Sequence, residues 1–349
     1  MRIAIVGCGS MGTVMGAYLN KNGCEVDMVD SYKDHVDALN TTGAHIIGCV
    51  DMVVPVRAML PEQMTGIYDL IFLFTKQHAN PQILPMLLEH LGENSTVCTL
   101  QNGVPEPGVA SIIGEKRTVG GTVLWCGTFH SPGVSELTQD ITLSDHLFDI
   151  GEMDGSIGPR IQMVADVLSK MGRPTHITDN LMGSRWGKLV NNACMSGMSA
   201  VCGCTFGEVL DNPTALACLS YLGREVKQCC EAEGYTLPHM LDGSDPNSLA
   251  LSSKAQFDES QRMFLDMYEV MRPAKASMLQ DLEKNKITEV LMINGYVCEA
   301  GRRTGIPTPF NDGVVRIVSA ASRGEQTLGI ENAKKLYSGE FEFSLYEDA

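Results

Sequence analysis

Positive charge is scarce in this chain. Of its 349 residues, 26 are Lys or Arg and 42 are Asp or Glu, which gives a formal net charge of −16. No run of clustered basic residues occurs, and a protein that binds duplex nucleic acid needs one. Nucleic acid is therefore not an expected partner, whereas a small anionic ligand needs only one or two local cations in a pocket.

Long apolar segments are also missing. The sequence holds no run of about 18 apolar residues, the length that a transmembrane helix needs, so we expect no membrane span. Its start, MRIAIVGCGSMG, passes from a short strand directly into glycines and is not expected to be a signal peptide. With 44% hydrophobic and 19% charged residues, the composition predicts a globular, cytoplasmic protein, and the length favours two domains.

No C-x-x-C pair occurs among the 12 cysteines. They are scattered, many of them in apolar contexts such as those of Cys98 and Cys218. Cys202 and Cys204 form a C-x-C, but no histidine lies at zinc-finger spacing. We therefore expect reduced, mostly buried thiols and no metal site.

Short apolar strands alternate with helical patterns in the first half of the chain. This alternation predicts a doubly wound, parallel sheet of the Rossmann type. Period-two stretches between residues 117 and 151 predict antiparallel strands that close the domain. Strands are expected at residues 2–6, 24–30, 44–50, 51–56, 69–75, 96–100 and near 175–179, and helices at 13–22, from 79 onward and at 159–171.

Strand patterns almost disappear after residue 179. The fold class is therefore α/β, with an N-terminal Rossmann-type domain over residues 1–180 and an all-α domain over residues 181–349. Residues 239–253 are rich in turn residues and predict a loop, and the acidic tail 338–349 is expected to be disordered. Helices are expected at residues 182–201, 213–233, 259–284 and 288–304.

The motif GCGSMG follows the first strand directly. Its glycines allow a tight turn and a close approach of the backbone to a pyrophosphate, and the helix that opens there supplies free N–H groups and a positive dipole end. Strand, turn and helix occur in the order that dinucleotide binding requires. The residues expected to hold the cofactor are Gly7, Gly9, Ser10, Met11 and Gly12.

Asp30 ends the second expected strand, 18 residues after Gly12. A carboxylate at about this distance from the motif accepts hydrogen bonds from the adenosine ribose hydroxyls of NAD. It would repel the 2′-phosphate of NADP, so we predict that NAD(H) is the preferred cofactor. NADP(H) stays the alternative, with Asp30 turned to solvent and Lys33 or Lys76 on the phosphate.

Two loops, FTKQH and LQNGV, follow later apolar strands. Parallel sheets of this type bind ligands at the carboxyl ends of their strands, so Thr75, Lys76 and Asn102 are expected to contact cofactor or substrate there. Each residue alone has a plainer interpretation as loop chemistry, because Asn-Gly is a common turn pair.

A polar stripe runs through the apolar helix WGKLVNNACMS. Lys188, Asn192 and Ser196 are spaced i, i+4, i+8 and share one helical face. In the plainer interpretation the lysine extends to water and nearby backbone satisfies the asparagine. In the functional interpretation the ammonium stabilises negative charge on a substrate oxygen and supplies it with a proton.

With these motifs the sequence resembles the ketopantoate reductase (2-dehydropantoate 2-reductase) family. Related β-hydroxyacid dehydrogenases share the glycine loop and the helical Lys…Asn pair, and the segment that begins at Ser277 favours the ketopantoate reductases. The matching pieces are GCGSMG, TK at 75–76, QNG at 101–103, SPGV at 131–134, WGKLVNN at 186–192 and SMLQDLEKNKITEVLMINGYV at 277–297.

The resemblance implies a Rossmann domain and a helical domain with catalysis in the cleft between them. It implies the reduction of 2-dehydropantoate to pantoate by NAD(P)H, a step of pantothenate biosynthesis. Lys188 would be the general acid, and Asn102 would hold the reacting region of cofactor and substrate. Further roles in contacting substrate or orienting the lysine would fall to Asn192, Ser196, Ser277 and Glu289.

Two of these residues also have plainer interpretations. KITEV predicts a helix start with Thr288 as N-cap and Glu289 in the first turn, where the helix dipole favours an acid. Ser277 would then be an ordinary helix serine.

Four features depart from the family pattern. Ser196 stands where the family often has a second substrate asparagine, and Leu291 stands where an aspartate commonly follows Thr-Glu. Residues 234–275 form a longer segment than usual. Asp30-Ser31 occupies the place where many NADPH-preferring members carry arginine.

Three hypotheses follow. The first is a nicotinamide-dependent reductase of a 2-oxo acid such as 2-dehydropantoate. The second is an NAD-dependent dehydrogenase of the same family that oxidises a different hydroxy acid or alcohol. The third is a dinucleotide-sensing scaffold without turnover, and the retained Lys188, Asn192 and Glu289 argue against it. A small 2-oxo or 2-hydroxy acid and a second copy of the chain, in a homodimer through the helical domain, are the expected partners.

Overall fold

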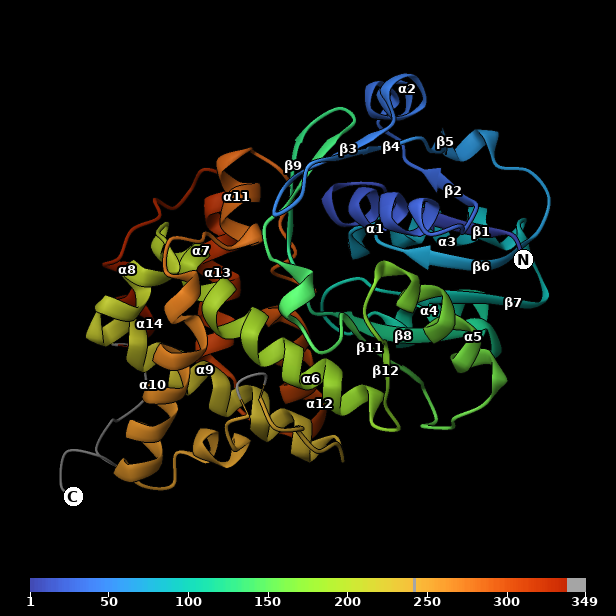
Figure 1. Ribbon diagram of the computed structural model, residues 1–349. Coiled ribbons are helices and arrows are strands. Elements are labelled where there is room, and N and C mark those ends of the chain that lie inside the picture. The colour runs from blue at the N-terminus through green and yellow to red at the C-terminus, as the bar shows by residue number, and fades with distance from the viewer. Residues whose placement is uncertain (241–242, 338–349) are drawn as a thin grey trace. The chain divides into compact units, whose positions relative to one another are not determined.

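The computed structural model describes residues 1–240 and 243–337 (Figure 1). The chain divides into two compact units, Met1–Leu181 and Met182–Ala349. The sequence predicts the division between residues 180 and 181. The tail 338–349, for which the sequence predicts disorder, lies outside the described residues.

An eight-stranded sheet organises the first unit. Its strands are β1 (Ile3–Val6), β2 (Val26–Val29), β5 (Arg57–Met59), β6 (Tyr68–Leu73), β7 (Leu91–Thr99), β8 (Thr118–Val123), β11 (Phe148–Glu152) and β12 (His176–Ile177). They lie in the order β12-β11-β8-β7-β6-β1-β2-β5. The neighbouring strands β8, β7, β6, β1, β2 and β5 are parallel to one another. β11 is antiparallel to β8, and β12 is parallel to β11. The predicted Rossmann-type sheet is confirmed.

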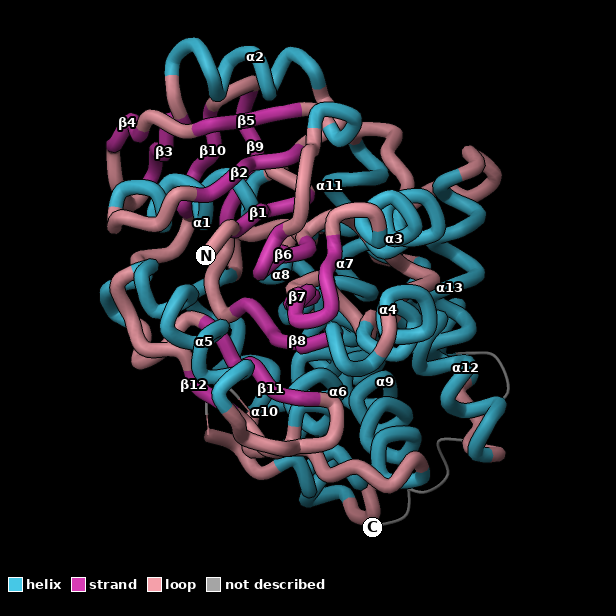
Figure 2. Tube along the Cα trace, turned by 90° about the vertical axis from the view of Figure 1, so that its right-hand side faces the viewer, coloured by secondary structure: helices cyan, strands magenta, loops and turns pink. Residues whose placement is uncertain are grey.

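Helices cover both faces of this sheet. Ile3 and Ile5 of β1 contribute to one hydrophobic core, and Ala4 and Val6 contribute to the other. A parallel strand that is buried on both faces reads as a continuous apolar run, which is how IAIV appears in the sequence. Figure 2 shows α1 and α5 on one side of the strands and α3 and α4 on the other. The helices are α1 (Ser10–Lys21), α2 (Lys33–Thr42), α3 (Asn80–Leu88), α4 (Glu106–Ile113) and α5 (Pro159–Leu168).

A second sheet corrects the prediction for this unit. Its strands are β3 (Ala44–Gly48), β4 (Met52–Val54), β9 (Gly127–Ser131) and β10 (Val134–Leu137), in the order β4-β3-β10-β9. The sequence pattern predicts the first two as strands of the main sheet and the antiparallel strands after residue 117 as the strands that close it. Alternate residues of β3 are buried, which is typical of a sheet with one open face. The three-residue edge strand β5 was missed, and α1 begins at Ser10 rather than Thr13.

The second unit is helical throughout its described part. Its helices are α6 (Leu181–Asn191), α7 (Gly197–Cys202), α8 (Phe206–Asp211), α9 (Pro213–Ala232), α10 (Lys254–Tyr268), α11 (Ser277–Glu283), α12 (Asn294–Thr304), α13 (Pro309–Ser322) and α14 (Asn332–Tyr337). Within residues 1–240 and 243–337, no helix is both long and apolar enough to cross a membrane. Eight of the twelve cysteines are buried thiols, as their apolar contexts predict.

Two predicted helices differ from those observed. The helix expected at 259–284 is two helices, because Pro273 lies between α10 and α11 and a proline disfavours helical geometry both at its own position and at the preceding residue. The helix expected at 288–304 begins only at Asn294. Thr288 therefore caps no helix, and Glu289 lies in the turn that precedes α12.

Candidate functional site

The glycines of the loop between β1 and α1 serve different purposes. Gly7 has a φ of +97°, and a Cβ there would lie 2.5 Å from the backbone nitrogen of Thr75. A Cβ at Gly12 would collide with the carbonyl oxygen of Gly7. At Gly9 a Cβ would meet no atom within 4 Å. Packing therefore requires the first and third glycines, and the second leaves room for a ligand to approach the backbone.

The N-terminus of α1 has no capping side chain. Its N-cap residue is Gly9, no side-chain hydrogen bond caps the helix, and its first turn contains no acidic residue. The N–H groups at Ser10 and Met11 therefore point out of the helix end beside a positive dipole. This arrangement fits a pyrophosphate.

Asp30 directly follows β2 and lies next to the glycine loop. The Gly7 N–H donates to Val29 O at 2.8 Å, and the Asp30 Oδ1 accepts from the Tyr32 N–H at 2.9 Å. Among the described residues, no Lys or Arg forms an ion pair with Asp30, and Lys33 pairs with Asp37 instead. A half-buried carboxylate without a cationic partner fits ribose hydroxyls better than a phosphate.

His35 is a buried residue of this region that the sequence analysis missed. Its Nδ1 accepts from the Gly133 N–H at 2.9 Å, so the proton lies on Nε2, which donates to Cys8 O at 2.7 Å. Burial lowers the pKa of His35, which keeps the ring neutral. The ring thus joins the glycine loop to the turn between β9 and β10. Its partners are backbone groups 27 and 98 residues away, so no spacing in the sequence indicates that His35 makes these hydrogen bonds.

Gln101 holds the two later loops together. Its Nε2 donates to Thr75 O at 2.6 Å and to Asn80 Oδ1 at 2.7 Å, and the Gln77 side chain donates to the carbonyl oxygen of Asn102. These loops follow β6 and β7, so they lie at the same edge of the sheet as the glycine loop. The sequence signal for Gln101 was its place inside the QNG motif.

One continuous helical rod carries the polar stripe of the second unit. It consists of α6, a π-helical turn over Asn192–Ser196, and α7. Every residue from 181 to 202 is buried except five that are half-buried. Those five are Ser184, Lys188, Asn191, Asn192 and Ser196. The polar stripe therefore begins at Ser184, one helical turn before the predicted start at Lys188. The spacing of four residues between Ser184 and Lys188 is the feature of the sequence that indicates it.

The π turn alters how the stripe is aligned. In a regular α-helix each step of four residues advances about 40° around the axis, so Ser196 would drift away from Lys188. Here the Gly197 N–H donates to Asn192 O, five residues back, and the wider turn reduces that drift. The prediction of one unbroken α-helix was wrong at this point. Single π turns inside α-helices are frequent at functional sites.

Asn294 donates a hydrogen bond to a carbonyl group of the π turn. In an α-helix the Gly197 N–H would bond to Ala193 O; here Ala193 O accepts from the Asn294 Nδ2 at 3.0 Å. The same Nδ2 donates to the Asn311 Oδ1 at 2.9 Å. Both asparagines are fully buried, so the π turn is held by a polar network inside the core.

Glu225 completes this network. Its carboxylate accepts from the N–H groups of Phe310 and Asn311 at 2.8 and 2.9 Å, and from the Asn311 Nδ2 at 2.7 Å. Burial raises the pKa of Glu225 to about 7, while these three donors act in the opposite direction. The carboxylate thereby caps the N-terminus of α13 and fixes Asn311 beside Asn294.

The remaining predicted residues are Ser277 and Glu289. Ser277 begins α11, which is hydrogen-bonded to α7 of the rod, and Glu289 lies in the turn before α12. Ser277 is the exposed first residue of α11, and the preceding Ala276 N–H donates to the Ser199 Oγ of α7 at 3.3 Å. Glu289 is only 8% exposed, and it lies five residues before Asn294. The interpretation of Glu289 as a surface acid in a first helical turn is wrong. Leu291 is 58% exposed.

The comparisons with known proteins decide the family. The family Ketopantoate reductase PanE/ApbA matches residues 3–149, and its C-terminal counterpart, Ketopantoate reductase PanE/ApbA C terminal, matches residues 180–322. This chain belongs to the ketopantoate reductase family. Membership identifies it as an NAD(P)-dependent oxidoreductase, as the sequence predicted.

Similar proteins extend over nearly the whole chain. A 2-dehydropantoate 2-reductase of Streptococcus pyogenes serotype M18 is 27% identical over 322 residues, which cover 92% of this chain and 97% of that protein. The ternary structure of D-mandelate dehydrogenase with NADH and anilino(oxo)acetate has a TM-score of 0.79 at 23% identity, over 93% of this chain and 99% of that one. A PanE/ApbA family ketopantoate reductase from Ralstonia eutropha JMP134 has a TM-score of 0.77 at 22% identity, over 94% and 100%. The two structures show that the fold is shared.

Proposed function

We propose that this chain reduces the carbonyl group of a small 2-oxo acid with a nicotinamide cofactor, and that Lys188 is the proton donor. The polar stripe of the helical unit carries the proposal. A lysine, an asparagine and two serines occupy half-buried positions along a rod that is otherwise almost fully buried. A π turn with its own buried network interrupts that rod inside the stripe, and a structural helix needs no such interruption.

The first unit would hold the cofactor. The uncapped N-terminus of α1 and the open side of Gly9 would take the pyrophosphate, and Asp30 would take the adenosine ribose. Thr75, Lys76 and Asn102 would lie toward the nicotinamide end. Bound NAD(P)H supplies the hydride that forms the new C–H bond at the substrate carbonyl carbon.

Lys188 would complete the reaction. As the C=O π bond breaks, negative charge develops on the oxygen, and the ammonium stabilises that charge and transfers one proton to form the hydroxyl group. The lysine is left neutral and regains its proton from water. Asn192, Ser196, Ser277 and Glu289 would bind the substrate or orient the ammonium, and the second half-buried serine, Ser184, extends the same face.

A second candidate is the oxidative reaction with NAD. The neutral Lys188 would then accept the proton of a 2-hydroxy acid while the hydride leaves for the cofactor. Asp30 without a cationic partner favours an NAD-linked enzyme, and the D-mandelate dehydrogenase of similar fold binds NADH. In this candidate the substrate is a 2-hydroxy acid other than pantoate.

A panel of substrates separates these candidates. The absorbance of NADH and NADPH is followed with a series of 2-oxo acids that includes 2-dehydropantoate, and that of NAD and NADP with the matching 2-hydroxy acids. We expect turnover of at least one 2-oxo acid, with 2-dehydropantoate the leading candidate. Turnover confined to 2-hydroxy acids would favour the dehydrogenase, and cofactor binding without any turnover would favour the scaffold. Sedimentation of the same preparation tests the predicted homodimer.

A further inference from the structure

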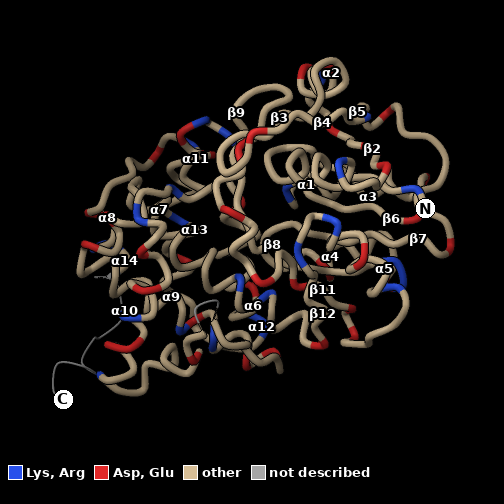
Figure 3. Tube along the Cα trace, viewed as in Figure 1, with Lys and Arg blue, Asp and Glu red and all other residues tan. Residues whose placement is uncertain are grey.

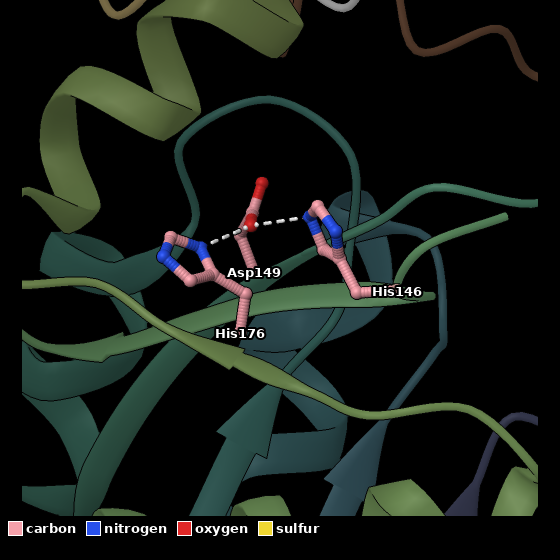
Figure 4. Close-up of side chains that lie close together, drawn as sticks. All are labelled: His146, Asp149 and His176. Atoms are coloured by element: carbon pink, nitrogen blue, oxygen red, sulfur yellow. Dashed lines mark hydrogen bonds and ion pairs between the residues drawn. The ribbon is translucent and has the colours of Figure 1, made fainter.

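Two histidines and an aspartate, none of them among the residues assigned above, converge at one edge of the main sheet. Each of the three side chains offers one ligand atom, and these three atoms lie within 4.8 Å of one another. The Asp149 Oδ1 lies 3.0 Å from His146 Nε2 and 2.7 Å from His176 Nδ1. Figure 4 shows the carboxylate between the two rings. Asp149 and His176 are direct partners across β11 and β12, and His146 comes from the loop that leads into β11.

The Asp149 carboxylate pairs with both histidines. Among the residues that the structure describes, Asp149 forms ion pairs only with these two histidines and with no Lys or Arg. The side chain of Asp149 is 18% exposed, and those of His146 and His176 are 36% and 56% exposed. The cluster is thus open to solvent on one side and fixed by strand pairing on the other.

We propose that His146, Asp149 and His176 form a binding site for a divalent transition-metal ion. Two imidazole nitrogens and one carboxylate oxygen are a donor set that zinc accepts, with water in the remaining positions. Ligand atoms about 2.1 Å from a tetrahedral ion lie about 3.4 Å apart, slightly wider than the present separations of the two ring nitrogens from the Asp149 Oδ1. The ion would take the place of the protons in the two hydrogen bonds between the imidazole rings and Asp149. Bonds from the three side chains to the metal would then replace these hydrogen bonds.

A metal ion bound at this site would stabilise the position of β12, the edge strand of the sheet. β12 contains only two residues, His176 and Ile177, and it lies at the edge of the sheet. So short a strand contributes few backbone hydrogen bonds of its own. A metal ion shared by His176, Asp149 and His146 would bind β12 to β11 and to the preceding loop through side chains. The expected role is therefore structural, and it is independent of the proposed oxidoreductase activity.

Calorimetric titration of the full chain with Zn²⁺ tests the proposal. We expect one site in the wild-type protein and a rise in Tm when Zn²⁺ is added. His176→Ala and His146→Ala should each weaken Zn²⁺ binding by at least tenfold and abolish the rise in Tm. His176 is the most exposed of the three side chains, so its variant is expected to fold, and circular dichroism checks this. His130→Ala is the matched control, because His130 pairs with a single carboxylate, Glu136, in the same unit.

Other outcomes contradict the proposal. If the wild-type protein takes up no Zn²⁺ in the titration, the cluster is only a hydrogen-bonded ion pair. If His176→Ala binds Zn²⁺ as tightly as the wild type, the ion lies elsewhere, for example on the exposed thiols of Cys49 and Cys126. Equal losses in His130→Ala and His176→Ala would also overturn the assignment.

Discussion

Asp30 is the residue on which the predicted preference for NAD(H) depends most. Its Oδ1 is fixed by the Tyr32 N–H, and Lys33, the nearest cation in the sequence, is paired with Asp37. A 2′-phosphate would meet this carboxylate, and like charges in contact cost several kcal/mol. We therefore predict that kcat/KM with NAD(H) exceeds that with NADP(H) by at least about tenfold.

The double variant Asp30→Ala, Ser31→Arg tests the cause of that preference. It removes the repulsion and adds a guanidinium that matches a phosphate, so the preference should shift toward NADP(H). The measurement is kcat/KM with both cofactors for the wild type and the variant. A wild-type enzyme that prefers NADPH would contradict the assignment of Asp30 to the ribose.

His35 predicts a pH dependence of stability. Its pKa is lowered by burial, so below about pH 6.5 the unfolded chain takes up a proton that the folded chain refuses. The contribution of His35 to the free energy of unfolding is therefore complete above about pH 6.5 and is lost as the pH falls from there toward the lowered pKa.

The matched variants are His35→Asn and His130→Asn. An asparagine at position 35 keeps an acceptor for the Gly133 N–H but does not titrate. Urea unfolding between pH 7 and 5 should show a smaller loss of stability in His35→Asn than in the wild type. His130→Asn removes an exposed histidine of the same unit and is the control for the loss of a histidine side chain as such. Identical slopes in all three proteins would mean that His35 is not the titrating group.

From the sequence, site residues could be proposed where a motif repeats a known mechanical requirement. The glycine loop, Asp30 and Lys188 belong to local patterns. The residue spacing in each pattern indicates a single strand, a single turn or one face of a helix. His35 could not be found in this way, and the QNG motif contains Gln101 without indicating what its side chain contacts. Their partners are groups distant in sequence, and only the packed sheet brings them together.

At the scale of elements, the π turn is the feature that the proposed site depends on most. Asn294→Ala would leave Ala193 O without its donor in the core, which costs about 1–3 kcal/mol. The turn could then relax toward a regular α-helix and move Ser196 relative to Lys188. We predict a fall in kcat of about 10- to 100-fold, because small displacements of positioned groups have large effects on rate. The Kd of NADH should not change.

Asn332 offers a matched control for this experiment. It is equally buried, and its Nδ2 also donates to a helix carbonyl, Val201 O at 3.0 Å, beyond the π turn. Asn332→Ala should lose a similar amount of stability in urea unfolding but keep kcat within about twofold, because no positioned group of the stripe moves. If both variants lose kcat in proportion to their stability, Asn294 has only a structural role.

Elements were predictable where their periodicity was complete. The strand β1 and residues 70–73 of β6 are apolar because both of their faces are buried, and that pattern is legible in the sequence. The first half of β7, which begins at Leu91, is polar and was missed. The second sheet was misassigned because β3 and β10 pair across a long sequence separation that periodicity does not report. The break between α10 and α11 was available in the sequence as Pro273.

At the scale of the whole molecule, the proposed reaction uses residues of both units of the chain. The proposed cofactor residues belong to Met1–Leu181, and the proposed proton donor belongs to Met182–Ala349. Cations are scattered among more numerous anions in both units (Figure 3). An acidic substrate must therefore be selected by particular side chains, and Lys188 is the half-buried cation of the stripe. Changes at Lys188 should alter turnover and leave cofactor binding intact.

The most direct test is the rate of Lys188→Ala with the substrate that the panel identifies. Steady-state kinetics give kcat, and fluorescence titration gives the Kd of NADH, for the wild type, Lys188→Ala and the control Lys254→Ala, whose exposed lysine pairs with Asp258. We predict that kcat of Lys188→Ala falls by about 10²–10⁴-fold while the Kd of NADH stays unchanged, and that Lys254→Ala behaves as the wild type. A Lys188→Ala variant with nearly normal kcat would contradict the account, because the lysine would then be a structural side chain that only extends to water.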